Sequence, residues 1–328
     1  MTWFERLTGI AERSPEQVRS QLQLDGDSLL CPDGRRIAYG SLETPTLGEL
    51  RSRVSELTIP GKLSVRQLVA DVRQLHADPC SAGALFQVAS QFNLLEMAGP
   101  TLTPEDGVGI YEHDATQGPA CAIACGGGTI YRNYFVRHGD VIGQSKERQI
   151  DCAADLGELL GNGAGELWRM QNGYLFPTAA GLQQINERLQ RADEAELDRY
   201  RASLRIGLQW NAAVTILGAS HRVSQAYCSA VPVAYTRHGA GQWEPLARLV
   251  LEAAYEAVFC AAVINASQDG CRRLFLTLLG GGVFGNQDRW ITDAIARAVA
   301  LHREQGLDVA IVSYNAPKPA VTELLERL

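Results

Sequence analysis

Residues 274–286, Leu-Phe-Leu-Thr-Leu-Leu-Gly-Gly-Gly-Val-Phe-Gly-Asn, run from an apolar stretch into a glycine-rich loop. A helical pattern begins directly after the loop, at Trp290. Glycines let backbone N–H groups approach an anion closely, and a helix start adds unpaired donors and the positive end of a dipole. The segment therefore predicts a cradle for the phosphates of a nucleotide-like ligand. The alternative is a glycine turn that serves packing alone.

Helix and strand patterns alternate around this loop. Residues 246–263 predict a helix, 273–279 a strand, 290–303 a second helix and 309–313 a second strand. This order favours an α/β core in which helices cover a parallel or mixed sheet. Ligands in such sheets bind at the carboxyl ends of strands, which is where the glycine loop would lie.

The rest of the chain predicts added helical parts. Residues 1–80 are expected to form a helical N-terminal extension, with Ser14 and Ser64 capping two of its helices. Residues 81–328 would form the main domain, with a helical insertion at about 154–205. Further strands are expected at residues 85–90, 205–211, 213–217 and 231–235, and a tightly packed helix or turn at 118–134.

Composition limits the class of protein. The chain has 328 residues, of which 46% are apolar, so it can bury a large core. Its net charge of −7 argues against non-specific nucleic-acid binding. No cysteine and histidine cluster has zinc-ligand spacing, since Cys121 and Cys125 are four residues apart but lack a second pair, so we expect reduced thiols in a cytoplasmic protein and no metal site. We expect no membrane span and no secretory signal; a signal for export as an effector is not readable.

The downstream half resembles the macrodomain family. Macrodomains have a loop after a strand with small residues, Gly, Val, an aromatic and Gly, and Gly281-Gly-Val-Phe-Gly285 has this pattern. The apolar helix at 249–263 contains an alanine–tyrosine pair like that of macrodomains, and the match extends through Ser313-Tyr-Asn. A Rossmann fingerprint is the rival interpretation, but it requires Gly-x-Gly-x-x-Gly near the start of a βαβ unit with an acid about 20 residues later, and we do not assign residues 280–286 to that context.

The resemblance implies an ADP-ribose pocket, with ADP-ribose as ligand or product and no required cofactor. It implies that the loop wraps the diphosphate through Gly281, Gly282, Val283, Phe284, Gly285 and Asn286. Phe284 would lie against a ribose, with a core aromatic as the alternative. Asn315 would lie near the nucleoside, or would simply form a turn.

The upstream half narrows the resemblance. Residues 86–96, 106–114 and 116–122 resemble divergent macrodomains related to the bacterial effector MavL. That group is distantly similar to poly(ADP-ribose) glycohydrolases and removes ADP-ribose from arginine, including that of ADP-ribosylated ubiquitin. The resemblance implies that Asp106 and Asp114 are catalytic and that the partner is an ADP-ribosylated protein. The chain has no Gly-Gly-Gly-x-x-Gly that is followed by Gln-Glu-Glu, the combination of typical poly(ADP-ribose) glycohydrolases, which argues against cleavage of the polymer.

A pair of acids suits this chemistry. Cleavage at the anomeric carbon passes through an oxocarbenium-like state that one carboxylate stabilises while another deprotonates water. A carboxylate also pairs bidentately with a guanidinium. Eight extended residues would separate Asp106 from Asp114 by about 26 Å, so both can act on one bond only if the segment folds back. The alternative for each aspartate is a turn cap.

Other polar residues upstream are further candidates. Gln91 and Asn93 are expected to bind ribose hydroxyls or adenine, or else to hold loops together. Glu96 and Glu112 are spare acids, and a solvated helix position is the alternative for Glu96. The sequence predicts a hydrolase that removes mono-ADP-ribose from arginine. A non-catalytic reader of ADP-ribose and an enzyme that consumes NAD are the alternatives.

Overall fold

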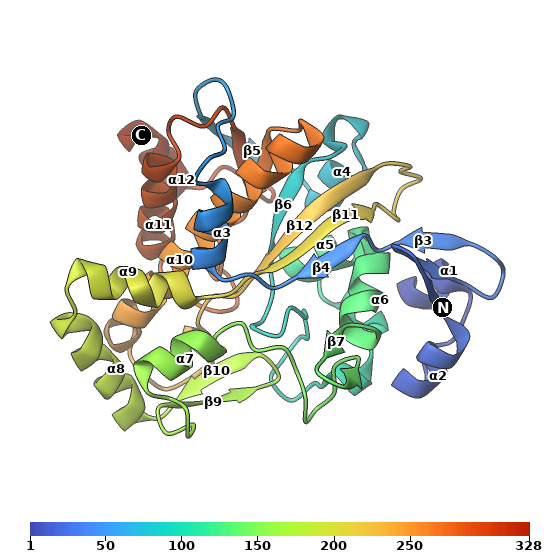
Figure 1. Cartoon of the computed structure of the whole chain (residues 1–328), viewed down its shortest axis with the longest axis horizontal. Coiled ribbons are helices and arrows are strands. Elements are labelled where there is room, and N and C mark those ends of the chain that lie inside the picture. The colour runs from blue at the N-terminus through green and yellow to red at the C-terminus, as the bar shows by residue number, and fades with distance from the viewer.

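A seven-stranded mixed sheet forms the centre of the computed structural model (Figure 1). The structure describes residues 1–328 except for the side chain of His138. Strand β11 runs in the opposite direction to the other six strands of the sheet. The predicted α/β class with a mixed sheet is therefore confirmed. The strand order is β4 (Ser41–Glu43), β11 (Gly207–Ala213), β12 (Arg222–Cys228), β6 (Leu85–Ala89), β13 (Arg273–Leu276), β14 (Asp308–Ser313) and β5 (Ser64–Val69).

Helices cover both faces of this sheet (Figure 1). The central parallel strands are buried on both faces, which explains why β6 and β13 are almost continuously apolar. One face carries α3 (Leu47–Val54), α10 (Ala240–Asp269) and α11 (Asp288–Leu301). The other carries α4 (Val72–Ala77), α5 (Gln117–Ala124) and α6 (Gly126–Tyr134).

The long helix α10 is the centre of the core. It is apolar on nearly all sides, as expected for a helix surrounded by protein. Among the described residues it is the one helix with the length and hydropathy to cross a membrane, but 94% of its most apolar window is buried. It ends at Gly270, whose φ of 73° gives the left-handed cap that glycine favours.

The first 80 residues differ from the predicted helical extension. The helix predicted from Ser64 is wrong, because Ser64–Val69 is the edge strand β5 and pairs in parallel with β14. Ser14 caps a helix as predicted. Strand β4 also joins the main sheet, so residue 80 does not separate a helical part from the sheet. The other N-terminal elements are α1 (Trp3–Thr8), α2 (Pro15–Gln21) and an antiparallel sheet of β1 (Gln23–Asp25), β2 (Ser28–Leu30) and β3 (Arg36–Ala38).

The remaining differences concern local pairing. The strand predicted at 231–235 is wrong, because Val233–Tyr235 forms the 3₁₀ helix η4 after Pro232. The separate strand predicted at 213–217 is wrong, because β11 ends at Ala213 and residues 214–217 are not in a strand; β12 was not predicted. The segment predicted as a helical insertion, about 154–205, contains three helices and also a hairpin. Its elements are α7 (Ala154–Leu160), β9 (Trp168–Gln171), β10 (Tyr174–Pro177), α8 (Ala179–Arg191) and α9 (Glu194–Ser203).

The chain is completed by short elements and one terminal helix. Two 3₁₀ helices, η2 and η3, lie between β6 and α5 and bear on the site described below. These elements are η1 (Pro79–Ser81), η2 (Pro104–Asp106), η3 (Gly109–His113), β7 (Arg137–His138), β8 (Val141–Ile142) and α12 (Pro319–Arg327).

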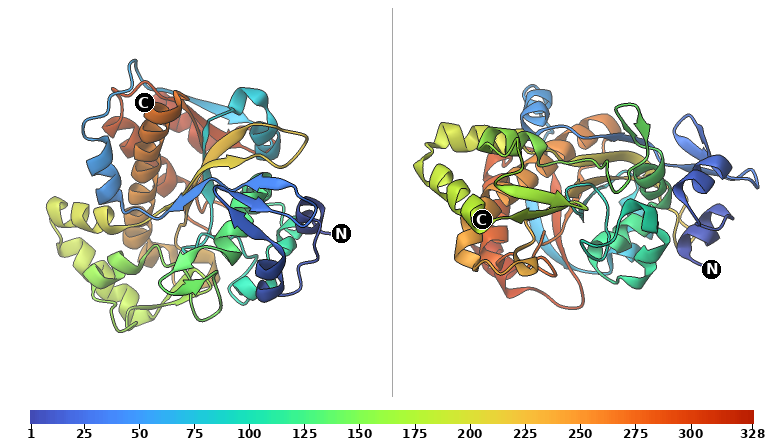
Figure 2. Two further views of the ribbon diagram at one scale, coloured as in Figure 1. Left: turned by 45° about the vertical axis from the view of Figure 1, so that its right-hand side comes forward. Right: turned by 90° about the horizontal axis from the view of Figure 1, so that it is seen from below.

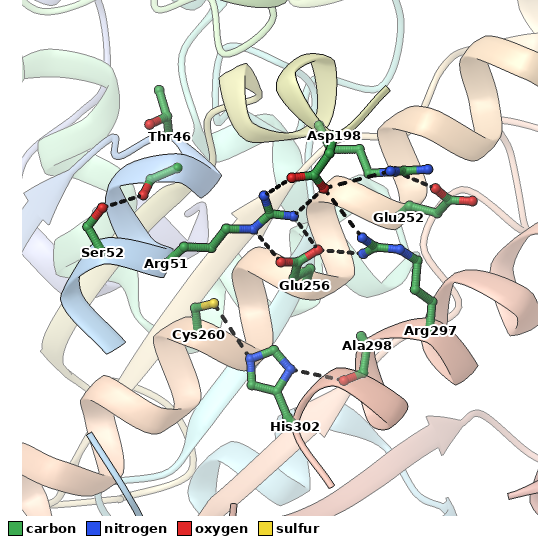
Figure 3. Close-up of polar contacts among 12 residues, drawn as sticks. Thr46, Arg51, Ser52, Asp198, Glu252, Glu256, Cys260, Arg297, Ala298 and His302 are labelled. Atoms are coloured by element: carbon green, nitrogen blue, oxygen red, sulfur yellow. Dashed lines mark hydrogen bonds and ion pairs between the residues drawn. The ribbon is translucent and has the colours of Figure 1, made fainter. Parts of the chain in front are cut away.

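An ion-pair network fixes the insertion to the core (Figure 3). Arg51 of α3 donates to Asp198 of α9 at 2.7 Å and also to the buried Glu256 of α10. Arg297 of α11 donates to the same Glu256 carboxylate. These partners raise the pKa of Arg51 and lower that of Glu256, so the network is charged. Four helices from distant parts of the sequence are thereby held together.

Candidate active site

A cavity lies at the carboxyl ends of β6, β12 and β13. Its walls come from the loop after β6, the start of α5, Ala230 after β12 and the glycine loop after β13. The cavity has a volume of about 260 Å³, close to the lower limit of small-molecule sites, which typically have about 300–1,000 Å³. Ligands of open α/β sheets bind at this edge.

The glycine loop is anchored at both ends. The Tyr255 hydroxyl on α10 donates to the Thr277 carbonyl at 2.7 Å and accepts the N–H of Leu279 at 2.9 Å. At the other end, the side chain of Asn286 donates to the Val231 carbonyl at 2.8 Å. The backbone N–H of Asn286 donates to the Gly280 carbonyl at 2.9 Å. The loop therefore has a fixed shape before any ligand binds.

The middle of the loop presents unused donors to the cavity. The backbone N–H groups of Gly282, Val283 and Phe284 donate to no acceptor among the described residues, and all three residues line the cavity. Gly280 has a φ of +73°, and a Cβ there would lie 2.4 Å from the Cβ of Ala230. Glycine is thus required at the start of the loop. Unpaired backbone N–H groups on successive residues are the kind of donors that anion-binding loops use.

The start of α5 forms the facing wall. The Gln117 side chain donates to the Gln87 carbonyl and accepts the N–H of Ala89, both at 2.9 Å, which fixes the helix to the end of β6. A Cβ at Gly118 would lie 2.1 Å from the carbonyl oxygen of Ala89, so only glycine permits this approach. The positive end of the α5 dipole therefore lies at the cavity.

Three aromatic rings form a third wall. Tyr174 of β10, Tyr235 of η4 and Phe284 of the glycine loop have ring centroids 5.1–5.6 Å apart. The Tyr174 hydroxyl donates to the Met97 carbonyl at 2.9 Å. The insertion thus contributes Tyr174 to the cavity, and the wall offers flat apolar surface to a sugar or base.

Glu96 is a buried acid on the cavity wall. Its side chain is 2% exposed, and neither carboxylate oxygen has a hydrogen-bond partner among the described residues. Burial raises the pKa of Glu96 to about 8, although the guanidinium of Arg132, 3.9 Å away, acts in the opposite direction. Arg132 itself is fixed, because it donates to the Leu94 carbonyl and stacks on Tyr227. Glu96 therefore holds a proton at neutral pH.

Asp114 is the second carboxyl on the cavity wall. It is half-buried and follows η3, where it accepts the backbone N–H of Thr116 at 2.8 Å. The cavity thus combines a buried, protonated carboxyl with one that is partly open to solvent. Two carboxyls in unlike surroundings are typical of an acid and base pair.

No protein-family model and no curated protein match this sequence. Among solved structures, the chain is similar to poly(ADP-ribose) glycohydrolase from Thermomonospora curvata bound to the inhibitor ADP-HPD. The identity is 14%, the TM-score is 0.46, and 95% of this chain and 96% of that chain are covered. It is also similar to poly(ADP-ribose) glycohydrolase from Deinococcus radiodurans in complex with ADP-ribose. Here the identity is 12%, the TM-score is 0.47, and 87% of this chain and 92% of that chain are covered. Similarities this distant do not establish a family or an activity.

Several predicted residues meet in the cavity. Its lining includes Gln91, Asp114, Gly282, Val283 and Phe284. Phe284 belongs to the aromatic wall, rather than to the core alone. The Gln91 amide is already used, because it donates to the Met97 carbonyl and accepts the N–H of Met97. Gln91 therefore shapes the loop after β6 as well as lining the site.

Other predicted ligand residues have supporting positions or lie elsewhere. Gly281, Gly285 and Asn286 belong to the glycine loop but are not among the lining residues. Asn93 is buried, and its side chain donates to Gln149 and accepts the N–H of Leu95, so it holds loops together. Asn315 is exposed with a φ of +65°, as in a turn, and does not line the cavity.

Of the two aspartates predicted to be catalytic, only Asp114 lines the cavity. Asp106 is exposed, and its carboxylate accepts the N–H and hydroxyl of Thr103 at 2.7 and 3.0 Å. It therefore caps η2, which is the alternative that the sequence left open. Residues 104–106 and 109–113 form 3₁₀ turns rather than an extended segment, but Asp106 is not among the residues that line the cavity.

Sequence reasoning underrated Glu96 and missed the tyrosines. A solvated position for Glu96 is wrong, since the side chain is buried beside Arg132. Its apolar neighbours, Leu94, Leu95 and Met97, were a local sign of burial. Tyr174 and Tyr235 come from the insertion and from η4, and nothing in their local sequence connects them to the glycine loop.

Proposed function

We propose that the protein is a hydrolase that cleaves the bond between the anomeric carbon of ADP-ribose and a modified side chain. One observation carries the proposal. The buried carboxyl of Glu96 and the more open carboxyl of Asp114 line the same cavity as an anion cradle of free backbone N–H groups. The cradle accounts for binding, and the carboxyls account for chemistry.

The cavity suits the parts of ADP-ribose. The N–H groups of Gly282, Val283 and Phe284 would donate to the diphosphate, assisted by the positive end of the α5 dipole. The rings of Tyr174 and Phe284 would lie against a ribose or the base. The glycine pattern shared with macrodomains supports the same assignment.

In the proposed reaction, water attacks the anomeric carbon while the bond to the departing nitrogen breaks and leaves its electron pair on that nitrogen. Asp114 takes a proton from the water, and its charge stabilises the oxocarbenium-like state. Glu96, protonated below about pH 8, gives its proton to the departing guanidine. The products are free ADP-ribose and arginine, and proton transfer through solvent from Asp114 to Glu96 restores the site.

We propose mono-ADP-ribosylated arginine as the substrate, carried by a protein such as ubiquitin. Asp114 supports this choice, because a partly exposed carboxylate at the cavity can pair with a guanidinium. The sequence resemblance to the MavL-related group supports it independently. All eight cysteines are free thiols, which supports action in a reducing compartment such as the cytoplasm.

The test uses ubiquitin that is ADP-ribosylated on arginine, with free ADP-ribose as the measured product. The proposal expects release by the native protein and loss of release in Asp114→Asn, while calorimetry shows ADP-ribose still bound. A substrate with ADP-ribose linked to serine or glutamate tests the preference for arginine. Binding without release from any substrate would make the protein a reader, and absence of binding would reject the cavity assignment. Consumption of NAD without a modified protein would indicate the third alternative.

A further inference from the structure

The segment 107–114 connects the two carboxyls of the cavity. Asp114 directly follows η3, and its N–H donates to the carbonyl of Tyr111 at 3.1 Å. The Tyr111 hydroxyl accepts the backbone N–H of Glu96, also at 3.1 Å. Tyr111 is fully buried, so this contact is not open to solvent. The positions of both carboxyls therefore depend on the placement of this one segment.

Glu12, almost one hundred residues earlier in the chain, holds this segment from the side away from the cavity. Its carboxylate accepts the N–H of Val108 at 2.9 Å and that of Gly109 at 2.7 Å. It also accepts the hydroxyl of Tyr134 on α6 at 2.7 Å. One carboxylate thus satisfies the backbone donors at the start of η3 and ties them to α6. Figure 2 shows the N-terminal helices beside this part of the molecule.

The sequence of the segment is adapted to this contact. A Cβ at Gly107 would lie 2.8 Å from the Glu12 carboxylate, and one at Gly109 would lie 2.6 Å from it. Gly107 also has a φ of +83°. The glycines on either side of Val108 therefore make room for an acid that comes from another part of the chain.

Trp3 makes a second pair of contacts to the same segment. Its indole N–H donates to the carbonyl of Val108 at 2.9 Å, and its backbone N–H donates to the Glu112 carboxylate at 2.9 Å. Trp3 is buried in a cluster with Phe4, Tyr111 and Tyr134. Helix α1 and Glu12 together hold residues 108–112 through both backbone and side-chain groups.

We propose that Glu12 is a positioning residue, which holds segment 107–114 so that Glu96 and Asp114 face the reacting bond. Glu12 is not among the residues that line the cavity, so it acts through the segment. The inference rests on the proposed hydrolase function, but it assigns to the N-terminal residues a role in turnover rather than in ligand binding. Catalytic groups displaced by about 1 Å can lose about 10²-fold in rate.

Glu12→Gln is the test, because it keeps the size of the side chain but replaces an acceptor oxygen with an NH₂ group that faces N–H donors. Glu16→Gln is the matched control, since Glu16 lies on α2, is 77% exposed and pairs only with Arg19 among the described residues. Single-turnover release of ADP-ribose and calorimetric binding of ADP-ribose are measured for both. We expect Glu12→Gln to release ADP-ribose about 10²-fold more slowly with unchanged binding, and Glu16→Gln to match the native protein.

A folded Glu12→Gln protein with native release would overturn the proposal, and so would equal losses of binding and rate. If Glu12→Gln does not fold, Tyr134→Phe removes one of the three contacts and is expected to show a smaller fall in rate with unchanged binding. If the native protein releases nothing, the hydrolase function fails separately. The positioning claim is then judged by amide hydrogen exchange, which should become faster at residues 107–114 in Glu12→Gln; unchanged exchange there would reject it.

Discussion

Glu96 lies with Oε2 3.9 Å from Nη2 of Arg132, and both side chains are buried. The Arg132 guanidinium has other partners, since it donates to the Leu94 carbonyl and to the Thr129 hydroxyl. At 3.9 Å it lies beyond hydrogen-bond distance of Glu96, and burial outweighs its charge in setting the pKa of that acid. Glu96 is therefore a buried carboxyl that holds its proton even beside the guanidinium of Arg132.

The raised pKa of Glu96 makes stability depend on pH. Burial raises that pKa from 4.5 to about 8, so between these values the folded protein holds a proton that the unfolded chain has released. The contribution of Glu96 to the free energy of unfolding is therefore full below pH 4.5 and is lost as pH rises through 8, a change on the order of a few kcal/mol. Urea denaturation of native protein and Glu96→Gln at several pH values measures it. As pH rises, the free energy of unfolding of the native protein should fall relative to that of Glu96→Gln. An unchanged difference between the two proteins across pH would contradict the burial argument.

Release of ADP-ribose should also depend on Glu96. The proposed proton donor loses its proton as pH rises through about 8. The single-turnover rate of the native protein should therefore fall above about pH 8. Glu96→Gln should be slower and should lack this decline. The measurement is the rate of release across pH, with ADP-ribose binding as control. A native alkaline decline that persists in Glu96→Gln would assign the titration to another group.

The two aspartates should behave differently. Asp114→Asn should abolish release because Asp114 lines the cavity, whereas Asp106→Asn should keep most of it because Asp106 is exposed and caps η2. Loss of a turn cap of this kind costs about 1 kcal/mol of stability. Release assays and thermal unfolding of both variants make the comparison. A strong loss of rate in a stable Asp106→Asn protein would restore Asp106 as a catalytic residue.

The shape of the glycine loop can be tested with an alanine variant of Gly280 and a control glycine outside the cavity. Gly280→Ala should weaken ADP-ribose binding and destabilise the fold by about 1–3 kcal/mol, because φ is +73° and the new Cβ would meet Ala230. Gly163→Ala is the control, because Gly163 does not line the cavity and has nothing within 4 Å of the added atom, so it should bind like the native protein. Calorimetry with ADP-ribose tests both. Equal effects of the two variants would show that loop shape does not control binding.

The Tyr255 hydroxyl should also stabilise the glycine loop, because it bonds the backbone at the start of the loop. Tyr255→Phe removes the hydroxyl that joins Thr277 to Leu279 and leaves two buried backbone groups with one partner fewer. We expect a loss of about 1–3 kcal/mol in stability and weaker binding of ADP-ribose. Tyr200→Phe is the control, since its hydroxyl bonds Glu196 within α9. Chemical denaturation and calorimetry distinguish the two, and native affinity in Tyr255→Phe would count against this anchoring.

Local patterns were enough for the part of the fold that surrounds the glycine loop. The helices α10 and α11 and the strands β13 and β14 are long or strongly apolar, and the loop between them is one continuous segment. Ser64–Val69 was misread because its identity as a strand depends on pairing with β14, almost 250 residues later. Strand β12 depends in the same way on its partners β11 and β6.

The site was harder to predict because its chemistry depends on contacts between distant residues. The backbone N–H groups of the glycine loop could be predicted from its local sequence. The burial of Glu96, by contrast, depends on Arg132 and on the other residues that line the cavity. Tyr174 reaches the site only because the insertion folds back onto the core. The contact of Glu12 with Val108 and Gly109 could not be read from either segment alone.

The most direct measurement is the release of free ADP-ribose from arginine-ADP-ribosylated ubiquitin by the native protein and by Asp114→Asn, with ADP-ribose binding measured on the same samples. The proposed function predicts release by the native protein, none by the variant, and binding by both. Native protein that binds ADP-ribose but releases none from this or any other linkage would contradict it.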